Sequence, residues 1–118
     1  MEKENLLVDL SKAFAVNSIR VYEIMKANGR ALAILNQFLR SATAIGANVH
    51  EGNYAASKAD FVNKFQIALK ECYETEYWLD IFRASGILED TTYQELYDAC
   101  HKLRRLLTSS IRTAKNNM

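Results

Sequence analysis

The chain has 118 residues, of which 49% are hydrophobic and 25% charged, and its formal net charge is +1. This length suits a single domain with a substantial core, and the near-neutral charge excludes a molecule whose whole surface attracts nucleic acid. There is no proline and there are only four glycines, which favours long helices over a turn-rich β fold. No apolar run approaches the ~18 residues of a membrane span, and the N-terminus lacks a signal-peptide core, so we expect a cytoplasmic protein.

Four helical segments are predicted in chain order, near residues 3–27, 30–51, 58–84 and 90–115. Gly29, Gly52 and Gly86 stand where the first three should end, because glycine past the last turn can adopt the left-handed conformation. Ser57 is the expected N-cap of the third segment, with Asp60 three residues further on. Short links between long helices force antiparallel neighbours, so we predict an all-α, up-down-up-down four-helix bundle over residues 1–118.

Each segment carries an apolar stripe in steps of three and four residues, as expected for a helix that faces a bundle core. Gly46 interrupts the second segment at a cost of roughly 1 kcal/mol relative to alanine, which indicates a close backbone approach or a bend. The predicted core residues are Leu6, Leu10, Phe14, Val21, Ile24, Ala31, Leu35, Phe38, Ala42, Ile45, Val49, Phe61, Phe65, Ala68, Cys72, Leu79, Tyr93, Leu96, Cys100, Leu103, Leu107, Ile111 and Ala114.

Three segments have further apolar residues on a second side, whereas a lone bundle needs only one stripe per helix. Scattered exposed apolar residues are normal, but lines of them at helical spacing indicate burial against another surface, most simply another copy of the chain. These second faces consist of Val8, Ala15, Ile19 and Tyr22, then Ala33, Ala44 and Ala47, then Ile67, Trp78 and Ile81.

Polar residues lie beside these second faces. Glu74 falls among the second-face residues of the third segment, and Arg40, Asn48 and Glu51 share a side of the second segment with Ala44 and Ala47. A buried carboxylate without a partner costs several kcal/mol, so Arg40 is expected to pair with one of the two acids, within a subunit or across to the next. Alternatively, Asn48 and Glu51 only hold the helix end and the loop after Gly52.

The last segment carries a local basic stripe, since no acidic residue follows Asp98. Such a stripe can track phosphates; the alternative is a solvated face whose cations suit a helix C-terminus. Tyr54 and Lys58, in the loop expected at the same end of the bundle, extend this surface, and a tyrosine can stack on a base. The candidate nucleic-acid-binding residues are His101, Arg104, Arg105, Arg112, Lys115, Tyr54 and Lys58; Lys102 falls outside the stripe.

Catalytic and metal-binding patterns are missing from the sequence. Two histidines cannot build the two Glu-x-x-His pairs of a di-iron bundle, and neither glycine-rich phosphate loop motif occurs. Cys72 and Cys100 are expected to be buried thiols, with a disulfide as the alternative. Glu76, near the core stripe, is expected to be a paired or snorkelling acid. We therefore predict no metal, no cofactor and no enzymatic activity.

The stretches LRSATAIGANVHEG, SKADFVNKFQIALKECYETEYWL and ASGIL resemble the bacterial four-helix-bundle family of 23S rRNA intervening-sequence (S23-type) proteins. The resemblance runs from about Leu6 to Lys115. Its most specific part is the pattern of Arg40, Asn48, Glu51 and Gly52, followed by Phe61, Ala68, Glu74 and Leu79 at the family's spacing.

The family is similar in fold to the accessory variability protein of diversity-generating retroelements, a homopentameric ring that works with a reverse transcriptase and its RNA. The resemblance implies a homo-oligomer, a pentamer in that fold, that acts as a non-enzymatic scaffold for RNA or a reverse transcriptase. The nearly neutral net charge departs from the retroelement type. The alternative is a protein-interaction module with no nucleic-acid role.

Overall fold

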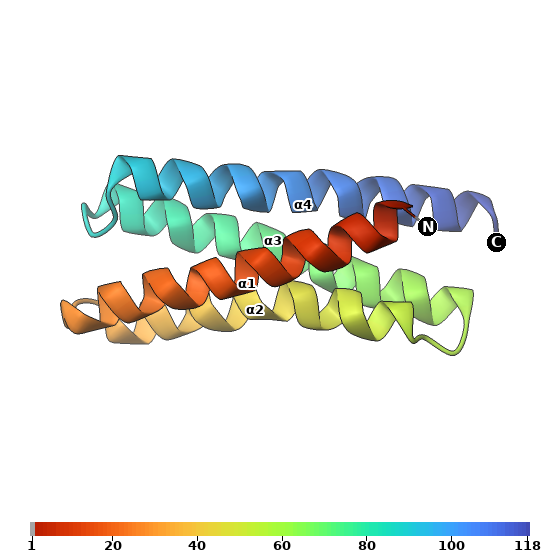
Figure 1. The fold of residues 1–118 in the computed structure, drawn as a ribbon, viewed down its shortest axis with the longest axis horizontal. Helices are drawn as coiled ribbons and strands as arrows, with labels where there is room; N and C mark the ends of the chain where they lie inside the picture. Colours follow the sequence, from red (N-terminus) through yellow and green to blue (C-terminus); the bar gives the residue numbers. More distant parts are fainter. Residues whose placement is uncertain (1) are drawn as a thin grey trace.

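A computed structural model describes residues 2–118, with side chains from Asn5 onward. It contains four helices joined by short links, namely α1 (Glu2–Ala27), α2 (Leu32–Asn53), α3 (Lys58–Ala84) and α4 (Asp90–Asn116). They run up-down-up-down along a rod of 47 × 21 × 19 Å (Figure 1). The described residues include no strand, so the all-α prediction is confirmed. No helix within residues 2–118 combines the length and the apolar content that a membrane crossing needs.

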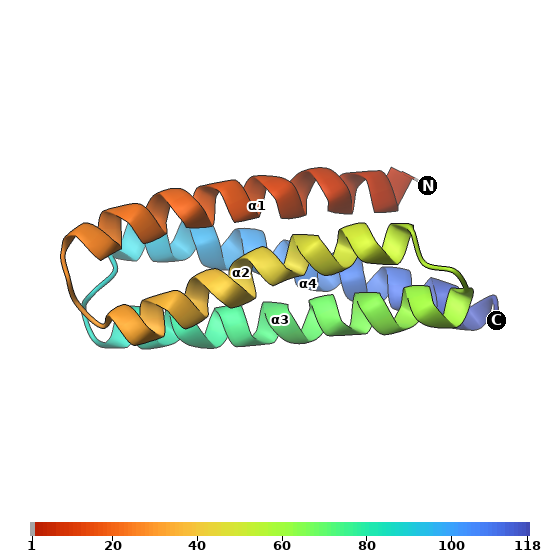
Figure 2. The same ribbon diagram turned by 90° about the horizontal axis from the view of Figure 1, so that it is seen from below.

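The four helices form a square in cross-section. Helix α1 packs against α2 and α4, and α3 packs against the same two helices, whereas the backbones of the diagonal pairs stay apart. In Figure 2, α1 and α3 therefore lie on opposite sides of the bundle. This arrangement gives α1 and α3 outward faces that point in opposite directions.

Local chemistry explains most of the helix ends. Ser57 caps α3, because its hydroxyl accepts the Asp60 backbone N–H at 3.1 Å. Gly29 and Gly86 follow α1 and α3 with φ values of 68° and 73°, as predicted for glycines beyond a helix end. Ala31 adopts a left-handed φ of 50° just before α2 and is exposed. Its predicted place in the core was therefore wrong.

The other two glycines lie inside α2, where this helix packs against α3 and α1. Gly52 lies inside the last turn of α2, so the prediction that it ends the helix in a left-handed conformation was wrong. A Cβ at Gly52 would lie 2.7 Å from the ring of Phe65, which is the reason for glycine at this position. A Cβ at Gly46 would lie 3.4 Å from the backbone oxygen of Ser11, which confirms the predicted close approach of another backbone.

The core confirms the predicted stripes of α2, α3 and α4, with Ala31, Phe61 and Ala114 as the exceptions. Phe61 and Ala114 are half-buried at its edge. In α1 the prediction was partly wrong, because Leu6 and Ile24 are 41% and 68% exposed whereas Leu7 and Met25 are buried. The buried stripe of α1 includes two serines, Ser11 and Ser18. A search for apolar periodicity misses this stripe because it counts only apolar residues. The stripe consists of Leu7, Ser11, Phe14, Ser18, Val21 and Met25.

The predicted second faces differ in how far the rest of the chain covers them. Helix α1 leaves five large apolar side chains exposed by 37–68%. On α3, by contrast, all three second-face residues are half-buried within the chain. Tyr22 is also half-buried and donates a hydrogen bond to Asn36 at 2.8 Å, which ties α1 to α2. The five exposed residues of α1 are Leu6, Val8, Val16, Ile19 and Ile24.

Candidate interaction surfaces

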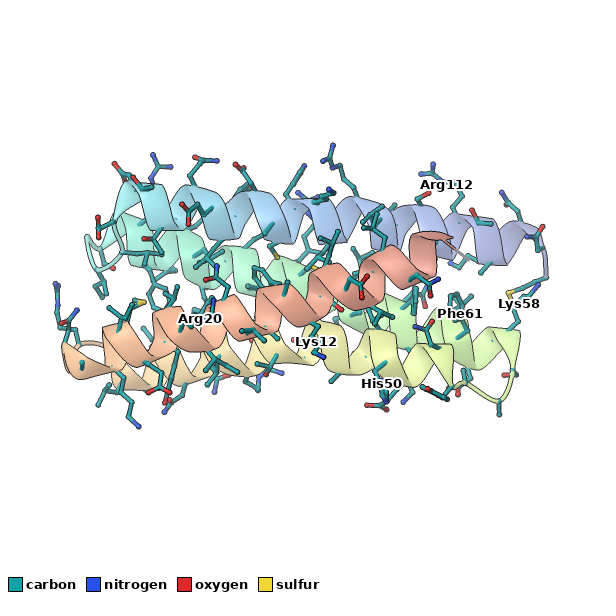
Figure 3. The ribbon with its side chains drawn as sticks, in the orientation of Figure 1. Lys12, Arg20, His50, Lys58, Phe61 and Arg112 are labelled. Carbon is teal, nitrogen blue, oxygen red and sulfur yellow. The ribbon has the colours of Figure 1, made fainter. Side chains whose placement is uncertain are left out.

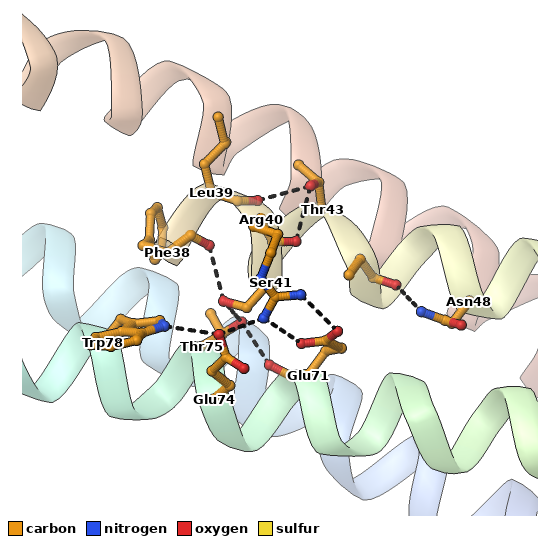
Figure 4. A network of polar contacts seen from close by, with 11 residues as sticks. Phe38, Leu39, Arg40, Ser41, Thr43, Asn48, Glu71, Glu74, Thr75 and Trp78 are labelled. Carbon is orange, nitrogen blue, oxygen red and sulfur yellow. Dashed lines mark hydrogen bonds and ion pairs between the residues drawn. The ribbon is translucent and has the colours of Figure 1, made fainter. Parts of the chain in front are cut away.

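A cluster of charged residues joins α2 to α3 on the outer side of the bundle. The Arg40 guanidinium donates from Nη1 and Nη2 to both carboxylate oxygens of Glu71, each at 3.1 Å. Its Nη2 also donates to Glu74 at 2.5 Å, and the Trp78 indole N–H donates to the same oxygen at 3.1 Å (Figure 4). The predicted pairing of Arg40 with an acid of the second face is thus present within one chain, with Glu74.

These contacts shift the ionisation of the cluster. The hydrogen bonds with Glu71 and then Glu74 raise the pKa of Arg40 above its ordinary value. Burial alone would raise the pKa of Glu74, but the hydrogen bonds from Arg40 and Trp78 outweigh it and lower that pKa. Both shifts favour the charged forms, so Arg40 and Glu74 form an ion pair at neutral pH.

Buried hydroxyls lie beneath this cluster. Ser41 and Thr75, both 0% exposed, are joined by a hydrogen bond of 2.9 Å between α2 and α3. Each also lies within 3.0 Å of a backbone oxygen of its own helix, Phe38 for Ser41 and Glu71 for Thr75. Together with Arg40, these contacts hold the two helices in a fixed register.

Asn48 and Glu51 do not join the Arg40 cluster. The Asn48 amide donates to the Ala44 carbonyl of its own helix at 2.9 Å, and Glu51 forms an ion pair with Lys64 at 3.3 Å. The pairing that the sequence left open between Arg40 and Glu51 is therefore absent. Neither side chain bonds to the loop after Gly52, so these contacts do not match the alternative in which the two groups hold that loop.

The predicted interface residues fall on two separate faces. Ile67, Trp78 and Ile81 are half-buried along α3, beside the Arg40 cluster. Ala44 is half-buried and Ala47 exposed on α2. Ile19, which is 43% exposed, lies on α1, the helix diagonally opposite to α3. The sequence pattern did not show that α1 and α3 face in opposite directions, because that depends on the arrangement of the bundle.

Part of the predicted basic stripe is engaged inside the molecule. Arg104 donates from Nε to the nearly buried Glu76 at 2.9 Å, and its guanidinium lies 4.9 Å from the ring centroid of Tyr73. Burial would lower the pKa of Arg104, but the bond with Glu76 raises it overall. Arg104 also donates to His101 Nδ1 at 2.5 Å, so this nitrogen acts as an acceptor. Arg104 is therefore a structural cation, and Glu76 is paired as predicted.

The remaining cations of the stripe are exposed. Arg105, Arg112 and Lys115 form no ion pair with any carboxylate in the described part of the chain. Arg112 projects outward from α4, and Lys58 lies at the end of the bundle, where its ammonium donates to the Asn117 carbonyl at 3.1 Å (Figure 3). Tyr54, 79% exposed, lies in the loop at that same end.

The two cysteines are buried in the core and form no disulfide with each other. Cys72 and Cys100 are free, buried thiols, and the Cys100 thiol donates to the Cys72 carbonyl at 3.5 Å. Interaction with Cys72 and then burial raise the pKa of Cys100, which keeps the thiol protonated and unreactive. Among the described residues no group of three His, Cys, Asp or Glu side chains is placed to hold a metal ion.

Sequence reasoning missed two residues of these surfaces. Glu71 forms the bidentate contact with Arg40. Its spacing could have predicted this role, because Glu71 lies three residues before Glu74 and therefore on the same side of α3. Ser110 is 2% exposed, and its hydroxyl has no hydrogen-bond partner in the described structure. No sequence signal distinguished Ser110 from the other helical serines.

Comparisons with known proteins agree with this architecture. No match was found among curated proteins. A crystal structure of a protein with unknown function from the S23 ribosomal protein family of Bacteroides thetaiotaomicron is 37% identical to this chain, with a TM-score of 0.90. The match covers 93% of this chain and 98% of that one. The model of the 23S rRNA-intervening sequence protein family matches residues 3–109. The chain therefore belongs to the 23S rRNA-intervening sequence protein family.

Proposed function

We propose that this protein is a non-enzymatic homo-oligomeric scaffold that binds RNA. The observation that carries the proposal is the α1 face formed by Val8, Val16 and Ile19, which are 37–43% exposed. On a helical wheel these three side chains lie within about 80° of one another, whereas the exposed Leu6 and Ile24 lie on the other flank of α1. The simplest cover for the α1 face is a second copy of the chain.

The positions of the two faces favour head-to-tail assembly. Because α1 and α3 are diagonal in the bundle, contact between the α1 face of one copy and the α3 face of the next leaves one face free on each copy. Repetition of such a contact closes into a ring or grows into a filament. We propose the closed form, a pentameric ring, in keeping with the resemblance to the retroelement accessory protein.

The RNA part of the proposal depends on the exposed cations of α4. Arg105 and Arg112 are seven residues apart, so they project from the same side of the helix. Lys115 and Lys58 continue the positive surface to the end of the bundle. In a ring this stripe would be repeated once per subunit. Several weak phosphate contacts on one assembly would then raise its overall affinity for RNA through avidity. The RNA partner proposed is a single strand, alone or held by a reverse transcriptase.

A mixing experiment tests the assembly. Ile19→Asp places a charge in the α1 face only, and Ile81→Asp places a charge in the α3 face only. We expect each variant to be monomeric alone and the mixture to form one-to-one dimers, because each variant keeps the face that the other has lost. Thr91→Asp, at an exposed position at the start of α4, is the matched control and should assemble like the wild type. Assembly of both single variants would contradict the proposed contact.

Salt-dependent binding tests the RNA part. The affinity for single-stranded RNA should fall steeply with salt, and Arg105→Ala with Arg112→Ala should weaken binding and flatten the salt dependence. Arg20→Ala removes an exposed arginine from α1 and is the control. Equal weakening by Arg20→Ala, or no binding at low salt, would contradict an RNA site on α4.

A second candidate function is a protein-assembly module with no nucleic-acid role. The observation that favours it is the engagement of Arg104 with Glu76, which removes a central cation from the stripe. Copurification of a protein partner that survives nuclease treatment, together with absence of RNA binding, would support this candidate over the first.

A further inference from the structure

The outer side of the α3–α4 pair carries aromatic side chains from both helices. Tyr73 and Tyr77 lie one turn apart on α3 and are 52% and 56% exposed. Tyr97 and His101 lie one turn apart on α4, both half-buried, with their rings within 11° of parallel and 6.2 Å between centroids. These four residues are called the aromatic surface below.

Arg104 joins the α3 half of the aromatic surface to the α4 half. Its guanidinium lies 4.9 Å from the ring centroid of Tyr73 and donates to Nδ1 of His101 at 2.5 Å. Its Nε donates to Glu76 at 2.9 Å, which anchors the arginine between the two helices. One anchored side chain therefore contacts an aromatic ring on each helix, so the two rings lie on the same side of the bundle.

The aromatic surface differs from the α3 face that is proposed above as a subunit interface and that consists of Ile67, Trp78 and Ile81. On the helical wheel Tyr73 lies about 80–140° around α3 from those three residues. Tyr77 lies nearer to them, and its ring packs on Trp78 at 5.1 Å between centroids. Head-to-tail assembly through the α3 face would therefore leave Tyr73 and the α4 half of the aromatic surface uncovered.

Exposed cations continue the aromatic surface along α4. Arg105 and Arg112 lie within about 40° of His101 around this helix, and neither pairs with a carboxylate in the described part of the chain. Arg112 lies eight residues beyond Arg104, or about 12 Å along the helix. That length suits roughly three or four stacked nucleotides at about 3.4 Å each.

The acids on this side of the bundle lie towards the opposite end. Asp80 accepts a hydrogen bond from Tyr93 at 2.6 Å, and Asp98 accepts one from Gln94 at 2.8 Å. No acidic residue follows Asp98 in the sequence. The side that carries the aromatic rings and the free arginines therefore favours an anionic partner, whereas a proline-rich peptide would gain contacts with the rings but none with the cations.

We infer that the aromatic surface stacks unpaired bases of RNA, with the adjoining phosphates on Arg105 and Arg112. This inference depends on the proposed RNA-binding function and adds to it the place where the bases are held. An aromatic side chain stacks on the face of any base, whereas the bases of a duplex already stack on their neighbours. The aromatic surface should therefore select single-stranded RNA with little preference for its sequence.

The test compares a labelled single-stranded RNA of about twelve nucleotides with a strand of the same length made of abasic units. Tyr73→Leu and Tyr77→Leu remove the rings but keep apolar side chains. Each should weaken binding of the RNA about fivefold or more and leave binding of the abasic strand unchanged, because only bases contact the rings. Tyr73→Phe keeps the ring and should bind RNA like the wild type. Tyr54→Leu, which removes a tyrosine that is 79% exposed outside this surface, is the matched control.

Unfolding curves and light scattering separate loss of stacking from loss of fold or of assembly. Tyr73 is more than half exposed and lies outside the α3 face. Tyr73→Leu should therefore unfold at nearly the same denaturant concentration as the wild type and have the same molar mass in solution.

Unchanged RNA affinity in both leucine variants of the aromatic surface, or an equal loss in Tyr54→Leu, overturns the inference. It is also overturned if a proline-rich peptide needs Tyr73 and Tyr77 for binding while RNA does not, since the surface would then serve a protein partner. If Arg105→Ala with Arg112→Ala still weakens RNA binding in these cases, the proposed RNA-binding function stands. Absence of any RNA binding at low salt overturns both.

Discussion

Arg40 and Glu71 form a bidentate pair, with two N–H···O contacts of 3.1 Å each, between α2 and α3. The same guanidinium also contacts Glu74, so one cation binds two carboxylates that lie about one turn apart on the facing helix. Guanidinium suits this position because its planar fork matches a carboxylate, whereas an ammonium group offers only a point charge. Arg40 thus aligns α2 and α3 beside the α3 face that we propose as an interface.

The first prediction concerns the shape of the Arg40 side chain. The Arg40 side chain is 48% exposed, so we expect Arg40→Ala to lower the free energy of unfolding by only about 1 kcal/mol. Arg40→Lys keeps the charge but loses the fork and should recover less than half of that loss. Urea unfolding at one fixed protein concentration measures both. Lys64→Ala, which breaks the single contact with Glu51, is the control and should cost less.

The second prediction concerns the loss of stability at acid pH through Glu74. The pKa of Glu74 is lower in the folded chain than its ordinary value of 4.5, so the unfolded state binds the proton more readily. The stabilisation from ionised Glu74 is therefore complete above pH 4.5 and is lost as the pH falls through the lowered pKa. Glu74→Gln should lack this contribution. The difference in unfolding free energy between the two proteins should shrink below pH 4.5; a difference that grows towards acid would contradict the assignment.

Periodicity and composition predicted much of the fold, and the failures have physical causes. Three stripes were predicted because their buried positions are mostly apolar. The stripe of α1 was misplaced because Ser11 and Ser18 occupy core positions, where small side chains allow close packing. In the site, the helical wheel predicted that Arg40 pairs with either Glu51 or Glu74. The choice of Glu74 and the added contact with Glu71 depend on the relative register of two helices. That register comes from packing, which a single-helix pattern does not contain.

The third prediction compares the two glycines of α2. Gly52→Ala places a methyl group 2.7 Å from the buried ring of Phe65 and should destabilise the fold by about 1–3 kcal/mol. Gly46→Ala places a methyl group 3.4 Å from Ser11, an ordinary contact, and gains roughly 1 kcal/mol of helix propensity. Thermal unfolding should show opposite shifts for the two variants. Equal destabilisation by both would contradict the assigned roles.

The fourth prediction concerns the two thiols. Burial and the contact between Cys100 and Cys72 keep both groups away from reagents in the native chain. A disulfide-exchange reagent should therefore label neither cysteine quickly under native conditions and both at once after unfolding in urea. Fast labelling of the native protein would contradict the buried positions.

The central claim is that copies of this chain cover one another's apolar faces. Light scattering of the wild-type protein at micromolar concentration measures its molar mass without any label or variant. We predict a mass of five times the 13.4 kDa of one chain. A mass of 13.4 kDa at every concentration tested would contradict the account, because the α1 face formed by Val8, Val16 and Ile19 would then stay exposed to water.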